Sequence, residues 1–310
     1  MRPSVAAILF VLLAPVCASA QSLYKYQGPD GEWIYADRPP ADGRVAEVRS
    51  LGEPIRGDAV SVTTSSVGGS VQFEAENPLH APVELTLRFS ELHGLRYPDP
   101  DRDLTWVLAP RSRERILTLS RRYDGRVPEA RYEFEYRLGD PAARHRPEQP
   151  YRVPFAIASH FPVTQAYPDV VTHTTEDSRY AIDIAMPVGT DVFAARGGTV
   201  ITTRGDNYRS GLDPERDGPA ANVVQILHDD GTFAVYAHLN WNTIRVRPGD
   251  RVVRGQYIAD SGNTGFSSGP HLHFVVLRNA GSRTVSVPVR FQGAESTVVT
   301  PATGATLTAY

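Results

Sequence analysis

Short runs in which hydrophobic and polar residues alternate recur along the chain, and this period of two residues predicts β-strands. Near the N-terminus, aromatic residues alternate with polar ones on both sides of a Gly-Pro-Asp-Gly sequence at 28–31. Two short strands joined by such a turn form a β-hairpin. We therefore expect a small hairpin module of unknown function at residues 21–45. It must pack on another surface, because a lone hairpin is marginally stable.

The region 58–140 repeats this pattern at the spacing of a β-sandwich. Turn-rich segments separate its alternating runs, which lie at 60–63, 69–74, 83–89, 116–119 and 132–137. Several short strands at this spacing are typical of an immunoglobulin-like sandwich. No motif in the region carries chemistry, so we expect it to position the rest of the chain or to contact a partner. Polar segments at 41–58 and 138–153 are predicted to be linkers.

A strong hairpin pattern lies at residues 222–239, where two apolar runs flank an Asp-Asp-Gly sequence. A two-residue Asp-Gly turn would pair His228 with Phe233 on one apolar face. The same register would put Tyr236 and His238 on the other, polar face. We interpret His228 as structural and His238 as functional.

Glycine corners between very short strands follow this hairpin, a pattern typical of a compact antiparallel sheet. The segment 204–221 is long and has no periodicity, so it is either a groove wall or lid, or a disordered insertion. Residues 293–310 are predicted to be an irregular tail. The predicted fold is mainly β, with an antiparallel sheet domain at 151–292 that follows the sandwich-like domain and the hairpin module.

Residues 1–20 have the features of a secretory signal peptide: Arg2, a short apolar stretch and a small-residue cleavage site at 18–20. The apolar stretch is too short for a membrane span, so the mature chain is expected to have no transmembrane segment. Cys17 is the single cysteine, and a lipid anchor there is a minor alternative. The net charge of −3 gives no indication of a nucleic-acid partner or a polybasic membrane contact. We expect an exported protein of the periplasm or cell envelope.

Two histidines stand on one face of a predicted strand in the sequence His271-Leu-His273, which follows a glycine-rich turn. Such a pair at the rim of a sheet suits a metal ligand beside a proton-handling group, although exposed strand histidines are the alternative. Asp183, in a strand-like run at 180–185, is by itself either a solvated carboxylate or a metal ligand.

Several separated motifs together resemble the lysostaphin/LytM-type zinc metallopeptidases, which cut peptidoglycan cross-links. The resemblance covers residues 155–292. It rests on Asp183, Gly198-Thr199-Val200, Tyr236-Ala237-His238-Leu239 and Gly265 to Phe274, which follow one another in the family's order. It implies an antiparallel LytM-type peptidase domain, a bound Zn²⁺ ion and peptidoglycan as the substrate.

The resemblance also implies roles for individual residues. In the family, zinc is held by a histidine and an aspartate of the first motif and by the second histidine of His-x-His. These positions correspond to Asp183 and His273 in this chain. His238 and His271 occupy the catalytic positions, where they would move protons and stabilise the oxyanion.

The first histidine of the family's metal site departs from the usual spacing, because Arg179 occupies its position. We predict that His173 folds back from a loop and supplies the imidazole as the third ligand. The alternatives are that His160 or Glu176 takes the place, or that the site is degenerate and binds no metal.

The predicted function is an exported zinc-dependent endopeptidase that hydrolyses peptide bonds of peptidoglycan through a metal-activated water. The alternative is a non-catalytic module that binds peptidoglycan or activates a cell-wall amidase. Asn222 and Tyr236 are candidates for contact with the substrate. The N-terminal half could contact a cell-wall protein, and the sandwich could occlude the groove.

Overall fold

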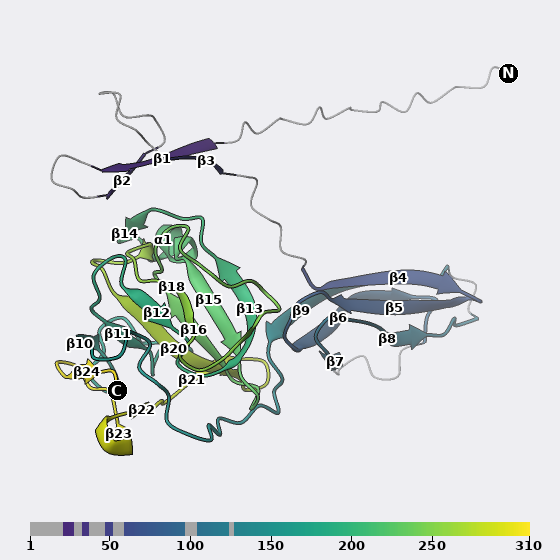
Figure 1. Cartoon of the computed structure of the whole chain (residues 1–310). Coiled ribbons are helices and arrows are strands. Elements are labelled where there is room, and N and C mark those ends of the chain that lie inside the picture. The colour runs from purple at the N-terminus through teal and green to yellow at the C-terminus, as the bar shows by residue number, and fades with distance from the viewer. Residues whose placement is uncertain (1–20, 28–32, 37–46, 52–58, 97–103, 124–126) are drawn as a thin grey trace. The chain divides into compact units, whose positions relative to one another are not determined.

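The computed structural model describes residues 21–27, 33–36, 47–51, 59–96, 104–123 and 127–310. The predicted signal peptide at 1–20 lies outside these residues. The chain divides into two compact units, Met1–Arg56 and Gly57–Tyr310. Among the described residues, no helix has the length and hydrophobicity that a membrane crossing requires. Strands dominate the described residues of both units, which confirms the predicted mainly β fold (Figure 1).

The first unit contains the predicted hairpin and one strand more. Strands β1 (Gln21–Gln27) and β2 (Trp33–Ala36) pair antiparallel, and β3 (Glu47–Leu51) pairs with the free edge of β1. The predicted turn at 28–31 lies outside the described residues. Strand β3 falls in the segment 41–58, which was predicted to be a linker, so that prediction is wrong for 47–51. A third strand gives the hairpin the extra pairing that an isolated one lacks.

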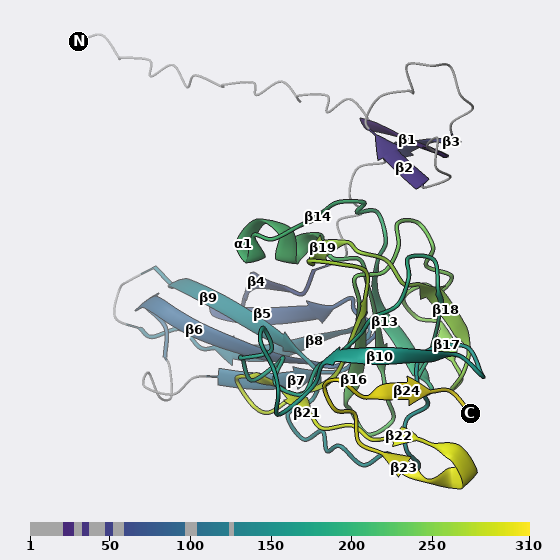
Figure 2. The same cartoon turned by 90° about the vertical axis from the view of Figure 1, so that its left-hand side faces the viewer.

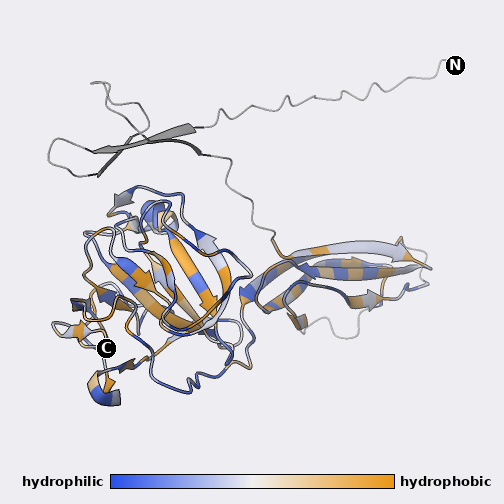
Figure 3. Ribbon diagram, in the orientation of Figure 1, coloured by the Kyte–Doolittle hydropathy of each residue, from blue (hydrophilic) through white to orange (hydrophobic). Residues whose placement is uncertain are grey.

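Residues 61–138 form the predicted β-sandwich. One antiparallel sheet has the order β4-β5-β8 and the other β7-β6-β9. The strands are β4 (Ser61–Val67), β5 (Ser70–Asn77), β6 (Val83–His93), β7 (Leu104–Leu108), β8 (Ser112–Leu119) and β9 (Glu129–Leu138). Figure 3 shows hydrophobic and hydrophilic positions alternating along β5. The hydrophobic positions of both sheets share one buried cluster that includes Phe73, Leu85 and Leu108. Strand β7 is the one the sequence analysis missed.

A nine-stranded sheet forms the centre of the region 151–310 (Figures 1 and 2). Its order is β17-β13-β15-β16-β20-β11-β10-β24, and β21 also pairs with β20. The strands are β10 (His160–Gln165), β11 (Ile182–Ile184), β13 (Gly198–Arg204), β15 (Val223–Leu227), β16 (Phe233–Ala237), β17 (Arg251–Val252), β20 (Leu272–Asn279), β21 (Thr284–Val287) and β24 (Thr306–Thr308). All of these pairings are antiparallel, as predicted.

Shorter elements surround this sheet. Strand pairs are β12 (Asp191–Phe193) with β18 (Tyr257–Asp260), β14 (Ser210–Gly211) with β19 (Gly265–Phe266), and β22 (Phe291–Gln292) with β23 (Val298–Val299). Helical turns are α1 (Pro214–Asp217), η1 (Gly218–Ala220) and η2 (Ala294–Ser296). One face of the large sheet packs on the main hydrophobic core, to which Val224, Tyr236 and Phe274 belong. The opposite face carries the residues of the candidate site.

The hairpin at 222–239 has a register different from the predicted one. Leu227, rather than His228, pairs with Phe233. Three residues form the turn, and Gly231 adopts the left-handed backbone (φ 80°) that such turns need. A shift of one residue in the pairing register changes which face of the partner strand a side chain joins. Tyr236 therefore lies fully buried in the core, where its hydroxyl accepts a hydrogen bond from the N–H of Ala195 at 2.7 Å. The prediction that Tyr236 contacts the substrate is therefore wrong.

The predicted irregular tail at 293–310 is also wrong. Strand β24 pairs with β10 and extends the large sheet. Leu307 and Ala309 are buried in the main core, since they alternate with Thr306 and Thr308 as inward-facing residues of an edge strand do. The folded region that begins near residue 151 thus continues to Tyr310.

The sandwich is anchored to the far end of β20. Asn279, which ends this strand and is fully buried, donates through Nδ2 to Glu84 Oε2 (2.9 Å) and to the carbonyl of Gly139 (3.0 Å). Ala81 of the sandwich packs with Phe233 of β16 in a shared hydrophobic cluster. Buried polar groups need such partners, so these contacts join the two regions at a defined place.

His228 is predicted to make stability depend on pH. Its Nδ1 lies 2.9 Å from the carbonyl of Gly197, and its buried Nε2 has no hydrogen-bond partner among the described residues. Burial lowers the pKa of His228 from 6.5 to about 4. The unfolded chain therefore binds the proton more readily between these values, so this stabilisation is complete above pH 6.5 and is lost as the pH falls towards 4.

We expect the wild-type free energy of unfolding to fall by about 3 kcal/mol more than that of His228→Asn between pH 7 and 4. Asparagine keeps a donor for the Gly197 carbonyl but does not titrate in this range. Urea unfolding at several pH values measures the difference. Parallel curves for the two proteins would contradict the role of His228.

Candidate functional site

Asp183 and His273 face each other across two neighbouring strands. They are direct partners in the antiparallel pairing of β11 with β20, so their side chains share one face of the sheet. His273 Nδ1 lies 2.9 Å from Asp183 Oδ1. His173, from the loop between β10 and β11, places Nε2 at 3.3 Å from the other oxygen, Asp183 Oδ2. Three side chains that are far apart in sequence thus form one cluster.

Of the residues considered for the third position, His173 is the one in the cluster. His160 lies exposed at the start of β10, where it pairs with Thr308 of the edge strand β24. Glu176 binds Arg283 on the surface at 2.9 Å. The loop therefore turns back far enough for His173, which is 5 % exposed, to reach the carboxylate.

Gln165, at the end of β10, belongs to the cluster although the sequence analysis missed it. Its Nε2 donates to Asp183 Oδ2 at 2.8 Å and lies 3.2 Å from His173 Nε2. Its Oε1 accepts the backbone N–H groups of Val171 and Thr172. Gln165 therefore fixes both the carboxylate and the loop that carries His173. The sequence around Gln165 does not indicate this role, since a lone glutamine in a strand has no characteristic pattern.

The cluster has the donor atoms of a divalent metal site. The ligating atoms of His173, Asp183 and His273 all lie within 4.8 Å of one another. Ligands of a tetrahedral zinc site with bonds of 2.0–2.1 Å lie roughly 3.4 Å apart. The distances from His273 Nδ1 to Asp183 Oδ1 (2.9 Å) and from His173 Nε2 to Asp183 Oδ2 (3.3 Å) are close to this value. Two imidazoles and one carboxylate are also a ligand set that leaves a fourth position open. The residues present therefore fit a zinc ion.

His238 and His271 lie beside the cluster, with ring centroids 4.5 Å apart. The Nδ1 atom of each ring faces a backbone carbonyl, that of Thr264 for His238 (2.7 Å) and that of Gly269 for His271 (2.8 Å). An N–H on Nδ1 that donates to a carbonyl leaves Nε2 as the acceptor of a neutral imidazole. His271 Nε2 lies 3.8 Å from Asp183 Oδ1, so it is directed at the cluster.

The backbone at His238 has a conformation that is uncommon for a residue with a side chain. Its φ is 60°, in the left-handed region, directly after β16 ends at Ala237. Such conformations concentrate at functional sites because the surrounding structure must hold them. Here the turn brings the imidazole to the carbonyl of Thr264.

The electrostatic state of the site suits metal binding and proton transfer. Burial alone would raise the pKa of Asp183, but hydrogen bonds from His173 and His273 hold that pKa well below its usual range. Burial, together with the neighbouring His271 and His273, lowers the pKa of His238 to about 4. At neutral pH the carboxylate is therefore ionised and His238 is neutral.

These residues line a trough of about 870 Å³. One wall includes Leu212 from the 204–221 segment, and another includes Val171, and both side chains are largely exposed. The segment 204–221 was predicted to be either a groove wall or lid, or a disordered insertion. The structure shows that it forms a wall of the trough. All lining residues fall between Thr164 and Leu277, so the described part of the sandwich contributes none and does not occlude the trough.

Gly265 allows the turn before His271 to lie against this wall. Its φ is 84°, and a Cβ atom there would come within 2.6 Å of Ala221. Any other residue would push the turn away from the segment 204–221. Gly265 is thus a steric requirement of the site.

Asn222 supports the site from behind. It is fully buried, and its Nδ2 donates to the carbonyls of Asn207 (2.7 Å) and Leu239 (3.2 Å). Its backbone N–H donates to Thr264 Oγ1 at 3.0 Å, and the carbonyl of Thr264 faces His238. Asn222 has no surface with which to touch a substrate, so that prediction is wrong, and its contacts instead position His238.

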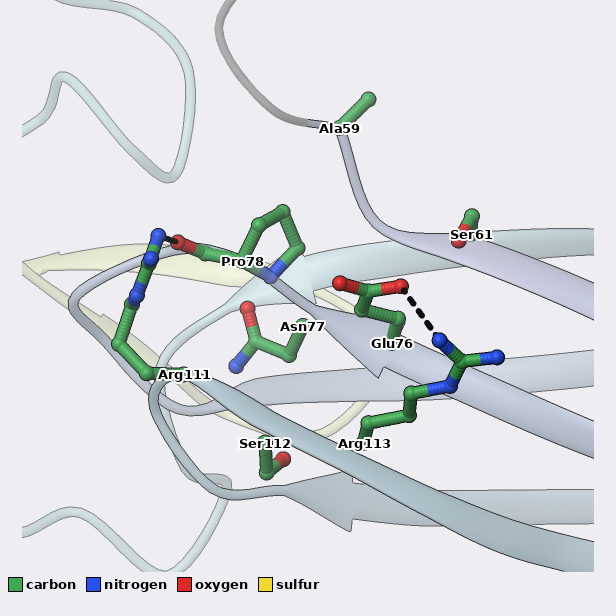
Figure 4. A pocket seen from close by; sticks show the side chains of 8 residues that line it. All are labelled: Ala59, Ser61, Glu76, Asn77, Pro78, Arg111, Ser112 and Arg113. Carbon is green, nitrogen blue, oxygen red and sulfur yellow. Dashed lines mark hydrogen bonds and ion pairs between the residues drawn. The ribbon is translucent and has the colours of Figure 1, made fainter.

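A second cavity, of about 410 Å³, lies where β5 ends and β8 begins, and Figure 4 shows the side chains that line it. Its arginines have partners: Arg113 forms ion pairs with Glu74 and Glu76, and Arg111 donates to the carbonyl of Pro78. None of the eight lining residues is a histidine. This cavity offers no comparable chemistry, and the trough is the candidate site.

Comparisons with known proteins match this region. Residues 177–285 match the model of Peptidase family M23. The peptidoglycan DD-endopeptidase ShyA of Vibrio cholerae serotype O1 is 34% identical over 139 residues, which cover 45% of this chain and 29% of ShyA. Lysostaphin of Staphylococcus simulans is 33% identical over 108 residues, which cover 34% of this chain and 20% of lysostaphin. The chain therefore spans less than a third of either relative.

Among solved structures, a catalytic domain of the prophage-encoded M23 protein EnpA from Enterococcus faecalis is similar to the same region. It is 28% identical, with a TM-score of 0.32, over 44% of this chain and 93% of that domain.

Removal of the Gln165 side chain is predicted to weaken metal binding. Groups that orient metal ligands typically contribute 10- to 100-fold to affinity, so we expect Gln165→Ala to raise the zinc dissociation constant by about tenfold or more. Competition with a fluorescent chelator measures this constant. Gln256→Ala is the matched control, because Gln256 also accepts a backbone N–H, that of Val253, but lies away from the cluster. Equal affinities for the two variants would contradict the assignment.

Proposed function

Because residues 177–285 form a peptidase family M23 domain, we propose that the chain is an exported zinc-dependent endopeptidase that hydrolyses peptide bonds of peptidoglycan. The observation that carries the proposal is the cluster of His173, Asp183 and His273 beside two further histidines in one trough. The relative ShyA, named a peptidoglycan DD-endopeptidase, favours peptide cross-links of peptidoglycan as the substrate class.

In this proposal His173, Asp183 and His273 hold the zinc ion. Zinc bound there would polarise the peptide carbonyl and lower the pKa of a water to roughly 7. The cluster favours zinc because its donors are two nitrogens and a carboxylate oxygen. Gln165 orients the carboxylate and the loop of His173, so the ligands meet without a large rearrangement.

His238 and His271 are the proposed proton carriers. The carbonyls of Thr264 and Gly269 favour an N–H on Nδ1 of each ring, which leaves Nε2 to accept a proton from the attacking water. The resulting imidazolium can then stabilise the negative oxygen and give its proton to the leaving amine. Their presence beside the cluster favours an enzyme over a module that only binds.

The proposed functional unit comprises residues 151–310 and lies outside the cytoplasm. Peptidoglycan is found there, and residues 1–20 have the composition of a signal peptide. The sandwich and the N-terminal module would position this unit or contact another cell-wall protein.

Loss of one ligand is predicted to remove both zinc and activity. We expect His273→Ala to retain less than about a tenth of the wild-type zinc content and to release no peptides from purified sacculi. His160→Ala, on the same sheet but outside the cluster, should match the wild-type protein. Metal analysis and chromatography of released muropeptides provide the measurements. A wild-type protein that holds no zinc and releases no peptide would refute the proposed enzymatic activity.

Loss of a proton carrier is predicted to separate binding from chemistry. We expect His271→Gln to keep its zinc but to lose activity by about 10²-fold or more, the usual contribution of a positioned acid or base. A wild-type protein that binds zinc and sacculi but hydrolyses nothing would instead favour the non-catalytic module. Unchanged activity in His271→Gln would remove the proposed role of this ring.

A further inference from the structure

Arg204 lies in the same cross-strand row as the metal-ligand cluster. In the antiparallel pairing, Arg204 of β13 is opposite Val223 of β15, and Val223 is opposite Ala237 of β16. Ala237 is in turn opposite His273, and His273 is opposite Asp183. Direct partners place their side chains on one face of a sheet. The row therefore leads across the floor of the trough from Arg204 to the cluster.

Arg204 is an exposed cation that has no acidic partner among the described residues. Among the described residues that line the trough, it is the one arginine or lysine. Its Nε donates to the carbonyl of Ala221 at 3.0 Å, which holds the side chain against the wall. No ion pair with a described carboxylate forms, and the two terminal nitrogens make no hydrogen bond to described residues. These terminal nitrogens can bind the two oxygens of a carboxylate side by side.

The floor between Arg204 and the cluster is apolar, formed by Val223 and Ala237. It offers no charged group that would compete for an anion. Of the trough's carboxylates, Asp183 lies in β11 and Asp177 precedes it, and β11 is four strands from β13. A negative group beside Arg204 would thus be separated from them.

The separation between Arg204 and the cluster defines a peptide length. Three strand spacings of about 4.8 Å separate Arg204 from His273, which gives roughly 14 Å. An extended peptide, at about 3.3 Å per residue, spans this distance in about four residues. A carboxylate that reaches Arg204 therefore belongs to a residue within about four positions of the bond at the cluster.

We propose that Arg204 forms a subsite that binds a free carboxylate of the peptide substrate, within about four residues of the hydrolysed bond. This inference rests on the proposed endopeptidase function. The carboxylate is either the C-terminal one or one on a side chain, since both present the same two oxygens to a guanidinium.

The test compares cross-linked muropeptide dimers that carry free carboxylates with the same dimers converted to carboxamides. We expect wild-type kcat/KM to be about tenfold higher for the free carboxylates, mainly through a lower KM. Arg204→Gln should hydrolyse both substrates at the wild-type rate for the amide. Arg204→Lys, which keeps the charge but not the paired geometry, should retain part of the preference.

Arg209→Gln is the matched control, since it removes a nearby arginine that contacts Tyr208 rather than the trough. It should keep the full preference. Two synthetic dimers, one amidated only at the C-terminus and one only at side chains, identify the source: the position at which amidation abolishes the preference is the position of the recognised carboxylate.

A wild-type enzyme that hydrolyses free and amidated dimers equally would overturn the subsite, and so would an Arg204→Gln variant that keeps the preference. A loss in Arg204→Gln that persists on the amidated dimer would also overturn it, because the residue would then act only through Ala221. Calorimetric binding of the dimers separates this inference from the proposed function. Suppose that no dimer is hydrolysed but the carboxylate form binds wild type more tightly than Arg204→Gln. The proposed carboxylate subsite is then supported, and the proposed endopeptidase activity is refuted.

Discussion

The site depends on the register in which β11, β20 and β16 pair. A slip by one residue would turn His273 and Asp183 into the core and expose Phe274 and Ile182. The hydrophobic face prevents this, since its residues fill the main core and could not leave it without a large loss of buried surface. The packing on one face of the sheet therefore determines which polar residues meet on the other.

Around this register, loops complete the site at a cost in local free energy. A buried carboxylate is unfavourable unless other groups bind it, and Gln165, His173 and His273 surround Asp183. His238 adopts a left-handed backbone, and Asn222 holds Leu239, the residue that follows it. Such arrangements persist because the large sheet beneath them contributes far more stability than they remove.

The sequence predicted the parts of this structure that follow from local periodicity. Alternation in His-Leu-His identified two imidazoles on one face, and the antiparallel, mainly β character followed from the same rule. Whether Tyr236 faced the trough depended on whether a turn has two or three residues, which Asp-Asp-Gly allows either way. The strand at Thr306–Thr308 is placed by a partner strand more than a hundred residues away, and Gln165 meets Asp183 through loop closure. Local sequence patterns predict neither kind of contact.

The cluster of two imidazoles and a carboxylate contains no sulfur, and residues 21–310 contain no cysteine. Thiolate ligands are readily converted to sulfenic acids or disulfides, whereas imidazole and carboxylate groups do not follow that chemistry. Oxidants that would dismantle a cysteine-based metal centre would therefore leave these donor atoms intact, so the site needs no reducing surroundings to survive.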